Sequence, residues 1–579
     1  MPDLSWREFD PSTFDEARNA DRPLLVLITK SWCPHSKRLL ATTFENPEVV
    51  RLVNERFIPV HVDAERRPDV NERYGRGSWP TIAYLTPVGE LVSSDGFLDP
   101  DQAITTFTRV SQHLRDNRAE IDAGLKSMWS KKRPAHEHDH GQLNQRITAD
   151  VVDAIFEKFD HRYGGWGDGS KFPHPEAIDF ALVQTAKDKD PRMREVVTLT
   201  LDKMLEGAIH DPIDGGFFRY SKTPDWRSPN HEKVLDANAQ RLRCYLEAYQ
   251  VFGNDSYRRC SEGIIDWMLG FMLDQETGAF FNSADADADY YLLDKQGRAA
   301  RSRPKVDRTI YANSNAMTVS ALLKASVVLD RPELRDIAMR ALNFLIENLY
   351  DERDGVFHYW DGTYHLPGML SDQAYMIRAL VDASQHSGNA DLLLPAERIA
   401  MLAIERQRAP DGGFFDILHD TRQPSSMQRR NRSILENSVM AEALVRLSYL
   451  VHRHEFHDEA VSTLEAFASD YKEYGYYVAG YGRAVDLIFY VPVTVTIVGP
   501  RDDPSTIELR QAALRTYVPS RIVQSLDPSS DPILMGRSGL TQEARPAAHF
   551  ALGHEEKGVA YSADELLQRI TELELHRHD

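Results

Sequence analysis

The chain has 579 residues, of which 42% are hydrophobic, and its formal net charge is −20 at pH 7. This length exceeds what one hydrophobic core usually organises, so we expect several domains. The negative charge argues against nucleic acid or an anionic membrane as a partner, because no basic stripe is available to displace their counterions. With only Cys33, Cys244 and Cys260, the chain has no disulfide framework and no metal site built from cysteines alone.

Sequence signals for a membrane or a cofactor are missing. Residues 1–21 are acidic and lack the basic segment and apolar run of a signal peptide, and no stretch of about 18 apolar residues occurs. The acidic run 285–289 resembles the start of a calcium loop, but Tyr290 stands where that loop needs glycine. Gly499-Pro500 follows a predicted strand without the glycine pattern of a nucleotide site. We therefore expect a soluble, cytoplasmic protein with no cofactor and no bound metal.

Residues 1–125 show the alternation of strands and helices that is typical of a small α/β domain. The pattern predicts strands over Pro23–Thr29, Phe57–Val62 and Thr81–Leu85, and helices over Lys37–Thr43 and Asp101–Leu114. Cys33 stands at the first junction between a strand and a helix, where helix-terminal amides and the helix dipole favour a thiolate. Cys33 is therefore a candidate nucleophile.

Ser36 occupies the position that the second thiol has in a Cys-x-x-Cys motif. Without that thiol, Cys33 cannot close a local disulfide. Three outcomes stay open for Cys33, namely a mixed disulfide with a client protein, oxidation to sulfenic acid, or a site that keeps its fold without chemistry.

Residues 126–145 are polar, charged and interrupted by Pro134, as is typical of a linker. Three histidines of this segment, His136, His138 and His140, alternate with acidic residues and are potential metal ligands. A flexible segment offers no preorganised geometry, so we favour a solvated linker over a metal site.

A glycine followed closely by aromatic residues recurs six times within residues 146–485. The signatures are Gly164-Gly165-Trp166, Gly215-Gly216-Phe217-Phe218, Gly278-Ala279-Phe280-Phe281, Gly355-Val356-Phe357, Gly412-Gly413-Phe414-Phe415 and Gly475-Tyr476-Tyr477. Each follows a helical pattern, as expected of a repeated unit that buries its apolar face only against its neighbours. Eleven helical patterns occur here, one fewer than six helical hairpins require. We predict an all-α (α/α)6 toroid with the aromatic turns around one open end.

Polar residues beside these turns are candidates for a carbohydrate site at the mouth of the toroid. The candidate substrate-binding residues are Arg219, Tyr220, Trp226, Asn238, Asn315, Trp360 and Asn437. The candidate catalytic residues are His231, Glu232, Asp285, Asp287, His358, Asp372 and Glu436. Asp372 and Glu436 begin helices, where capping explains an acidic residue equally well. Residues 486–579, with strands over Val491–Val498 and Arg521–Ser525 and a helix between them, predict a small C-terminal α/β domain.

Ordered motifs along the chain resemble those of the spermatogenesis-associated protein 20 family. In the N-terminal domain they are Cys33 to Phe44, Asn46-Pro47-Glu48-Val49-Val50, Asp63, Arg67-Pro68-Asp69-Val70, Trp79-Pro80 and Leu85-Thr86-Pro87. In the toroid they include Gly215-Gly216-Phe217, Arg219-Tyr220, Trp226, Glu232-Lys233, Asn238-Ala239, Ser283-Ala284-Asp285-Ala286-Asp287, Asn315 and Glu436-Asn437-Ser438. The resemblance implies a thioredoxin-like N-terminal domain and a six-hairpin glycosidase-like toroid. The thioredoxin-like site that it implies comprises Cys33, His35, Ser36, Trp79 and Pro80.

The chain departs from that family's pattern at its reactive positions. The family typically carries Cys-His-Trp-Cys-His where this chain keeps only Cys33, so the resemblance implies that dithiol oxidoreductase activity is lost. His231 stands where the family more often has phenylalanine, and Ala237 stands where it has aspartate.

Three functions stay open at this point, and the third of them is a non-catalytic scaffold. The first is an enzyme that acts on a sugar-like small molecule. Hydrolysis needs two carboxyl groups about 5 to 10 Å apart, drawn from Asp285, Asp287, Asp372 and Glu436, whereas isomerisation or epimerisation suits His231 and His358 as acid and base. The second is a thiol-dependent binding or redox module that captures a client protein through Cys33, with the toroid as a scaffold.

Overall fold

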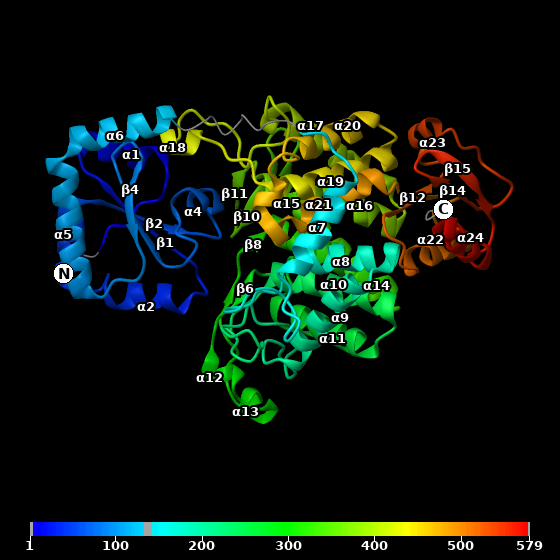
Figure 1. Cartoon of the computed structure of the whole chain (residues 1–579), viewed down its shortest axis with the longest axis horizontal. Helices are drawn as coiled ribbons and strands as arrows, with labels where there is room; N and C mark the ends of the chain where they lie inside the picture. The colour runs from blue at the N-terminus through cyan, green and yellow to red at the C-terminus, as the bar shows by residue number, and fades with distance from the viewer. Residues whose placement is uncertain (1–3, 132–140, 577–579) are drawn as a thin grey trace.

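The computed structural model describes residues 4–131 and 141–576, which form three parts in a row (Figure 1). An N-terminal α/β domain lies on one side of a helical ring, and a C-terminal α/β domain lies on the other. The three linker histidines named above lie outside the described residues. Within the described ranges, no helix is both long and apolar enough to span a membrane.

The N-terminal domain is built on a four-stranded sheet in the order β2-β1-β3-β4. Strand β1 (Leu24–Thr29) runs parallel to β2 (Ile58–Asp63) and antiparallel to β3 (Thr81–Leu85), and β3 pairs antiparallel with β4 (Leu91–Asp95). Every residue of β1 is buried, because helices cover both faces of the sheet. Those helices are α1 (Pro11–Ala20), α2 (Pro34–Thr42), α3 (Pro47–Arg56), α4 (Pro68–Tyr74), α5 (Pro100–Asp116) and α6 (Arg118–Lys131). The arrangement confirms the thioredoxin-like fold.

The ring consists of inner and outer helices that alternate along the chain. The inner helices are α8 (Pro175–Asp188), α10 (Leu235–Phe252), α14 (Ala312–Val328), α16 (Leu370–Ser387), α19 (Ile434–Val451) and α21 (Ala479–Phe489). Each packs against the next, and α21 packs back against α8, which closes the ring. The outer helices are α7 (Arg146–Glu157), α9 (Pro191–Glu206), α11 (Asp255–Trp267), α15 (Glu333–Asn348), α17 (Leu393–Gln407) and α20 (His454–Glu465). The predicted (α/α)6 toroid is confirmed.

The twelfth helix, which the sequence patterns did not show, is α21. It contains Gly480 and Gly482 and follows the irregular helical turn Tyr471–Val478, so local propensity does not mark it as a helix. Its place in the ring accounts for its helical form: Gly482 lies so close to α7 that an added Cβ would stand 2.8 Å from a methyl carbon of Val151.

Three of the six glycine-aromatic signatures are turns that are fixed from inside by an asparagine side chain. The side chain of Asn238 accepts a hydrogen bond from the backbone nitrogen of Phe217 at 2.7 Å and donates one to its carbonyl oxygen at 3.0 Å. Asn315 holds Phe280 in the same way, and Asn437 holds Phe414. The recurrence therefore serves the architecture, because the turn of each of these hairpins is hydrogen-bonded to an asparagine of the next inner helix.

Most of the turn aromatics pack inside the ring, whereas Tyr477 of the sixth turn is 53% exposed. Trp166, Phe217, Phe280 and Phe414 are all buried in the main hydrophobic core. These four rings therefore form no open surface at the mouth of the ring, and the glycines before them have a positive φ.

Short strands and helices surround the end of the ring that faces the N-terminal domain. The strands are β5 (Lys233–Val234), β6 (Ser283–Ala284), β7 (Val306–Asp307), β8 (Ile310–Tyr311), β9 (Tyr350–Asp351), β10 (Gly355–Trp360) and β11 (Tyr364–Pro367). The short helical segments are α12 (Ala288–Tyr291), α13 (Lys295–Ala299), α18 (Ser425–Gln428) and η1 (Met268–Met272). The short helix η2 (Ala390–Leu392) lies at the other end of the ring, where the preceding residue Asn389 accepts a hydrogen bond from Arg501 of the C-terminal domain.

The C-terminal domain repeats the sheet arrangement of the N-terminal one. Its order is β13-β12-β14-β15, in which β12 (Val493–Val498) runs parallel to β13 (Arg521–Leu526) and antiparallel to β14 (Ala547–Leu552), and β14 pairs antiparallel with β15 (Glu555–Ala560). Its helices are α22 (Pro504–Arg515), α23 (Pro532–Ser538) and α24 (Ala563–His576). Strand β13 is bound to the ring, since the backbone nitrogen of Val523 donates to Gln385 of α16 at 2.8 Å.

Candidate functional site

Cys33 lies against the toroid. It is the residue before α2, its side chain is buried, and its Sγ donates to the carbonyl oxygen of Trp79 at 3.6 Å. The Trp79-Pro80 peptide is cis. Cys33 packs in one apolar cluster with Val234 and Ala237, which belong to the toroid. The thiol of the thioredoxin-like domain is therefore covered by the ring.

The other two residues of that site differ in exposure. His35 is exposed on the first turn of α2, whereas Ser36 is buried, and its hydroxyl has no hydrogen-bond partner among the described residues. A serine hydroxyl in this position cannot resolve a mixed disulfide, because it is not a thiolate nucleophile at neutral pH.

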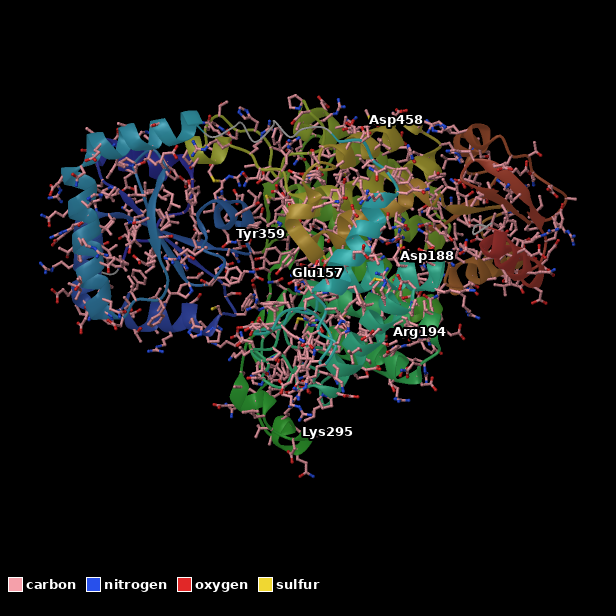
Figure 2. All side chains as sticks on the ribbon, in the orientation of Figure 1. Glu157, Asp188, Arg194, Lys295, Tyr359 and Asp458 are labelled. Atoms are coloured by element: carbon pink, nitrogen blue, oxygen red, sulfur yellow. The ribbon has the colours of Figure 1, made fainter. Side chains whose placement is uncertain are left out.

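Polar contacts join the N-terminal domain to the mouth of the ring. Arg66 forms an ion pair with Asp361 at 2.9 Å, and Arg73 forms one with Asp416 at 3.0 Å. The guanidinium of Arg66 also lies over the ring of Tyr359. Tyr359 is labelled in Figure 2 and lies where the N-terminal domain meets the ring. Further contacts are the ion pairs Lys37–Asp285 and Glu90–Arg429 and the hydrogen bond from Ser31 to Asp307.

His358 and Asp372 form a buried pair under this interface. The Nδ1 of His358 lies 2.8 Å from Oδ2 of Asp372, and its Nε2 lies 2.7 Å from the carbonyl oxygen of Glu65 in the N-terminal domain. Burial by itself would lower the pKa of His358, but the carboxylate of Asp372 outweighs it and the pKa is raised. Both ring nitrogens face acceptors, so the imidazolium form suits the site best.

The raised pKa of His358 predicts that stability falls as pH rises. Because folded His358 keeps its proton at pH values at which the unfolded side chain has lost it, the contribution is fully present below about pH 6.5 and is lost as pH rises through the folded pKa. In that window we expect a loss of up to about 1.4 kcal/mol in the free energy of unfolding per pH unit. Urea titrations between pH 6 and 9 measure it, and the slope should be smaller in His358→Gln. An equal slope in both proteins would contradict the assignment.

The structure brings Glu436 close to this pair. Burial raises the pKa of Glu436 well above its usual range, and the nearby carboxylates of Glu72, Asp416 and Asp372 add to the shift. Its Oε2 has no hydrogen-bond partner among the described residues. Glu436, Asp372 and His358 thus lie together beneath the N-terminal domain.

A second group of predicted residues lies around Arg219. The Nε of Arg219 donates to the buried carboxylate of Glu232 at 2.5 Å, and its guanidinium stacks between the rings of Tyr220 and Trp32. His231 contacts the ring of Phe218 and is half-buried, and burial lowers its pKa.

The remaining predicted residues serve the local structure. Asn238, Asn315 and Asn437 use their amides on the turns described above. Trp226 is fully buried and donates from Nε1 to the carbonyl oxygen of Tyr163 at 2.8 Å. Trp360 packs edge-on against Phe344. Asp287 caps α12, and Asp285 pairs with Lys37 of the N-terminal domain.

A space lined by the inner helices lies along the axis of the ring. Two overlapping cavities of about 80 Å³ and about 140 Å³ share Asp179, Arg243, Ser320, Arg378, Glu442 and Arg483. All six inner helices contribute to the lining. The smaller cavity is nearer the mouth and includes Glu176 and Tyr375, and the larger one reaches the C-terminal domain at Tyr517 to Ile522.

Two carboxyl groups in this axial cavity differ in their pKa. Asp179 and Glu247 are within hydrogen-bond reach of each other, and both contact Arg243, at 2.9 and 3.0 Å. Burial outweighs the attraction of Arg243 and raises the pKa of Asp179 to about 7. Burial by itself would also raise the pKa of Glu247. The cations Lys324 and Arg243 outweigh this effect and hold the pKa of Glu247 far below its usual range. One carboxyl group can thus carry a proton near neutral pH beside another that is ionised.

The sequence patterns did not reveal this cavity. Its charged residues lie inside helices that also carry long apolar faces, and such residues ordinarily mark the solvent side of a helix. A usable signal was present, because the buried-type helices α10, α16 and α19 each carry an acidic and a basic residue four positions apart.

Comparisons with known proteins agree with this architecture. Residues 2–147 match the family model Thioredox_DsbH, described as "Protein of unknown function, DUF255". The chain is 22% identical to human spermatogenesis-associated protein 20 over 91% of this chain and 84% of that protein, and 26% identical to the mouse protein over 49% of this chain and 39% of that one.

Solved structures resemble the toroid in fold. They include a cellobiose 2-epimerase from Bacillus thermoamylovorans (11% identity, 56% of this chain and 87% of that chain, TM-score 0.47) and a sugar epimerase from a ruminal bacterium (12% identity, 60% of this chain and 97% of that chain, TM-score 0.49). The resemblance seen in the motifs is confirmed: the chain begins with a domain of the Thioredox_DsbH type and is similar to spermatogenesis-associated protein 20 along nearly its whole length.

Proposed function

We propose that the toroid binds a sugar-like small molecule in its axial cavity and performs acid–base chemistry on it, with the thioredoxin-like domain as a cover over the mouth. The observation that carries the proposal is the enclosed polar cavity, lined by all six inner helices and containing the Asp179–Glu247 pair. A ligand rich in hydroxyl groups fits this lining, because Gln240, Ser320 and Ser438 offer short polar side chains beside the ring of Tyr375.

The geometry of the carboxyl pair favours proton transfer over hydrolysis. Hydrolysis needs two carboxyl groups that flank the scissile bond about 5 to 10 Å apart, whereas Asp179 and Glu247 contact each other. In the proposed chemistry the ionised Glu247 takes the proton from a carbon beside the carbonyl group of the open-chain sugar, while Asp179 delivers its proton to the carbonyl oxygen. The reverse transfers then return a proton to carbon and reprotonate Asp179. This is the exchange that isomerisation or epimerisation of a sugar requires.

Binding and chemistry can be tested separately. We expect sugars that bind to raise the melting temperature of the full chain, in a panel of monosaccharides, amino sugars and sugar phosphates. In D₂O, deuterium should enter a carbon-bound position of the active sugar, and Asp179→Asn should slow this about a hundredfold or more while binding persists.

The control variant is Glu157→Gln on the exposed surface of α7, labelled in Figure 2, which should change neither readout. If no member of the panel shifts the melting temperature, the proposal fails. It also fails if Asp179→Asn exchanges deuterium at the rate of the unmodified chain.

A further inference from the structure

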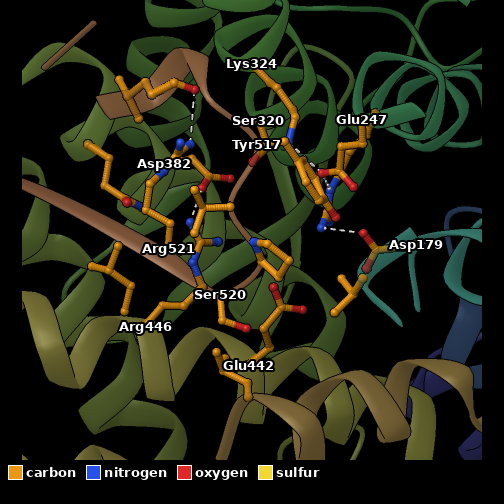
Figure 3. A pocket seen from close by; sticks show the side chains of 18 of the residues that line it. Asp179, Glu247, Ser320, Lys324, Asp382, Glu442, Arg446, Tyr517, Ser520 and Arg521 are labelled. Carbon is orange, nitrogen blue, oxygen red and sulfur yellow. Dashed lines mark hydrogen bonds and ion pairs between the residues drawn. The ribbon is translucent and has the colours of Figure 1, made fainter. Parts of the chain in front are cut away.

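The deeper end of the axial cavity is a closed, cation-rich space. The loop between α22 and β13 covers it, and Figure 3 shows Tyr517, Ser520 and Arg521 of this part facing the inner helices. Six cationic side chains line it: Arg243, Lys324, Arg378, Arg446, Arg483 and Arg521. Four carboxyl groups oppose them, Asp179, Glu247, Asp382 and Glu442, in a chain whose net charge is −20. A local surplus of positive charge in an acidic protein calls for an anion.

The ion pairs within the cavity do not neutralise all of this positive charge. Lys324 is paired with Glu247 at 2.6 Å, and Arg446 is paired with Asp382. Arg521 has no carboxylate partner within the described residues; it donates to the carbonyl oxygens of Leu514, at 3.1 Å, and Thr516. Burial and the nearby Arg446 lower the pKa of Arg521 to about 10, as expected of an enclosed cation without a counterion.

Two further groups point to a missing ligand. Within the described ranges Arg378, which lines both parts of the cavity, forms no ion pair or hydrogen bond. The Nδ1 of His386 is buried there without a hydrogen-bond partner among the described residues. Arg378 is half-buried, whereas the Nδ1 of His386 is buried, and buried polar atoms are nearly always paired in native proteins. Both groups fit an unfilled anion site.

We propose that the ligand of the axial cavity carries a phosphate group, held at the closed end by Arg378 and Arg521. A guanidinium binds the oxygens of a phosphate through two parallel hydrogen bonds, which suits a dianion better than a neutral hydroxyl group. The sugar part would then lie toward Tyr375 and the mouth. Only the sugar part of this inference rests on the proposed function, because the anion site is inferred from its own residues.

Calorimetry on the full chain tests the site with three probes: inorganic phosphate, glucose 6-phosphate and glucose. We expect inorganic phosphate to bind and glucose 6-phosphate to bind more tightly than glucose. Arg378→Gln should weaken the binding of both phosphate compounds about tenfold to a hundredfold and leave glucose unchanged. Arg521→Gln should do the same, but it also loses bonds to two carbonyl oxygens, so Arg378→Gln is the decisive variant. Arg194→Gln, on the exposed surface of α9, is the control.

The outcomes separate the two proposals. If inorganic phosphate binds in an Arg378-dependent way and no sugar or sugar phosphate adds to it, the phosphate site stands and the sugar function fails. If glucose binds as tightly as its phosphate, or Arg378→Gln leaves phosphate binding intact, the phosphate site is refuted. Binding of glucuronate without binding of any phosphate compound would likewise refute it.

Discussion

Gly215→Ala is expected to destabilise the toroid by about 3 kcal/mol or more. The residue has a φ of +79°, and a Cβ there would stand 1.9 Å from the carbonyl oxygen of Gly263 on α11. The left-handed conformation alone costs an alanine about 1 to 2 kcal/mol, and the overlap with rigid helix backbone adds to it. Urea denaturation followed by circular dichroism measures the loss.

Gly253→Ala is the matched control. Gly253 also has a positive φ, of +66°, but no heavy atom lies within 4 Å of the position of its Cβ. This variant should therefore lose only the conformational cost of about 1 kcal/mol. Equal losses in the two variants would mean that α11 and the turn at Gly215 are not in the close contact described here.

Asp211→Asn is expected to cost about 3 to 5 kcal/mol. The carboxylate of Asp211 is fully buried and neutralises two cations, Lys233 at 2.6 Å and Arg298 at 2.8 Å. Burial by itself would raise the pKa of Asp211, but Lys233 and Arg298 outweigh it and the pKa is lowered. Its contribution is therefore present above the unfolded pKa and is lost as pH falls through the folded pKa. With asparagine in place, the ammonium of Lys233 remains buried without an ion-pair partner, because the carbonyl oxygen of Gly215 that it also contacts is neutral.

Two comparisons isolate the charge effect at Asp211. Asp214→Asn removes a less buried partner of Arg298 and should cost about 1 kcal/mol. Adding Lys233→Met to Asp211→Asn should restore part of the lost stability, because it removes the unneutralised charge. A double variant less stable than Asp211→Asn would contradict the charge explanation. Melting curves of the four proteins provide the measurement.

The ring could be predicted from sequence because its repeat leaves a local signature. Each hairpin needs glycine at a left-handed turn, and the aromatic residue that follows fills the core beside it, so the pair recurs wherever a turn recurs. Helix α21 has no such advantage, since its glycines are required by close packing on α7. The signature also gives no direction in space, so it does not tell whether an aromatic ring points into the core or toward solvent.

The candidate site could be predicted only in part, for a related reason. His358, Asp372 and Glu436 were identified because they lie beside the turns, and the structure brings them together at the mouth. Asp179, Glu247 and Arg378 lie in helix interiors, where a charged residue normally faces water. The charged face of such a helix points inward only when six helices close into a ring. The sequence of a single helix does not show this closure.

Domains whose sheets have the same strand order lie at both ends of the ring, so separation of either domain would widen the access of a molecule to the axis. At the N-terminal end, that separation would break the ion pairs of Arg66 and Arg73 in addition to the small apolar contact at Cys33. Dissolved salt screens charges that become exposed to water. Ionic strength, more than temperature, would then govern how fast small molecules exchange between the axis and bulk solvent.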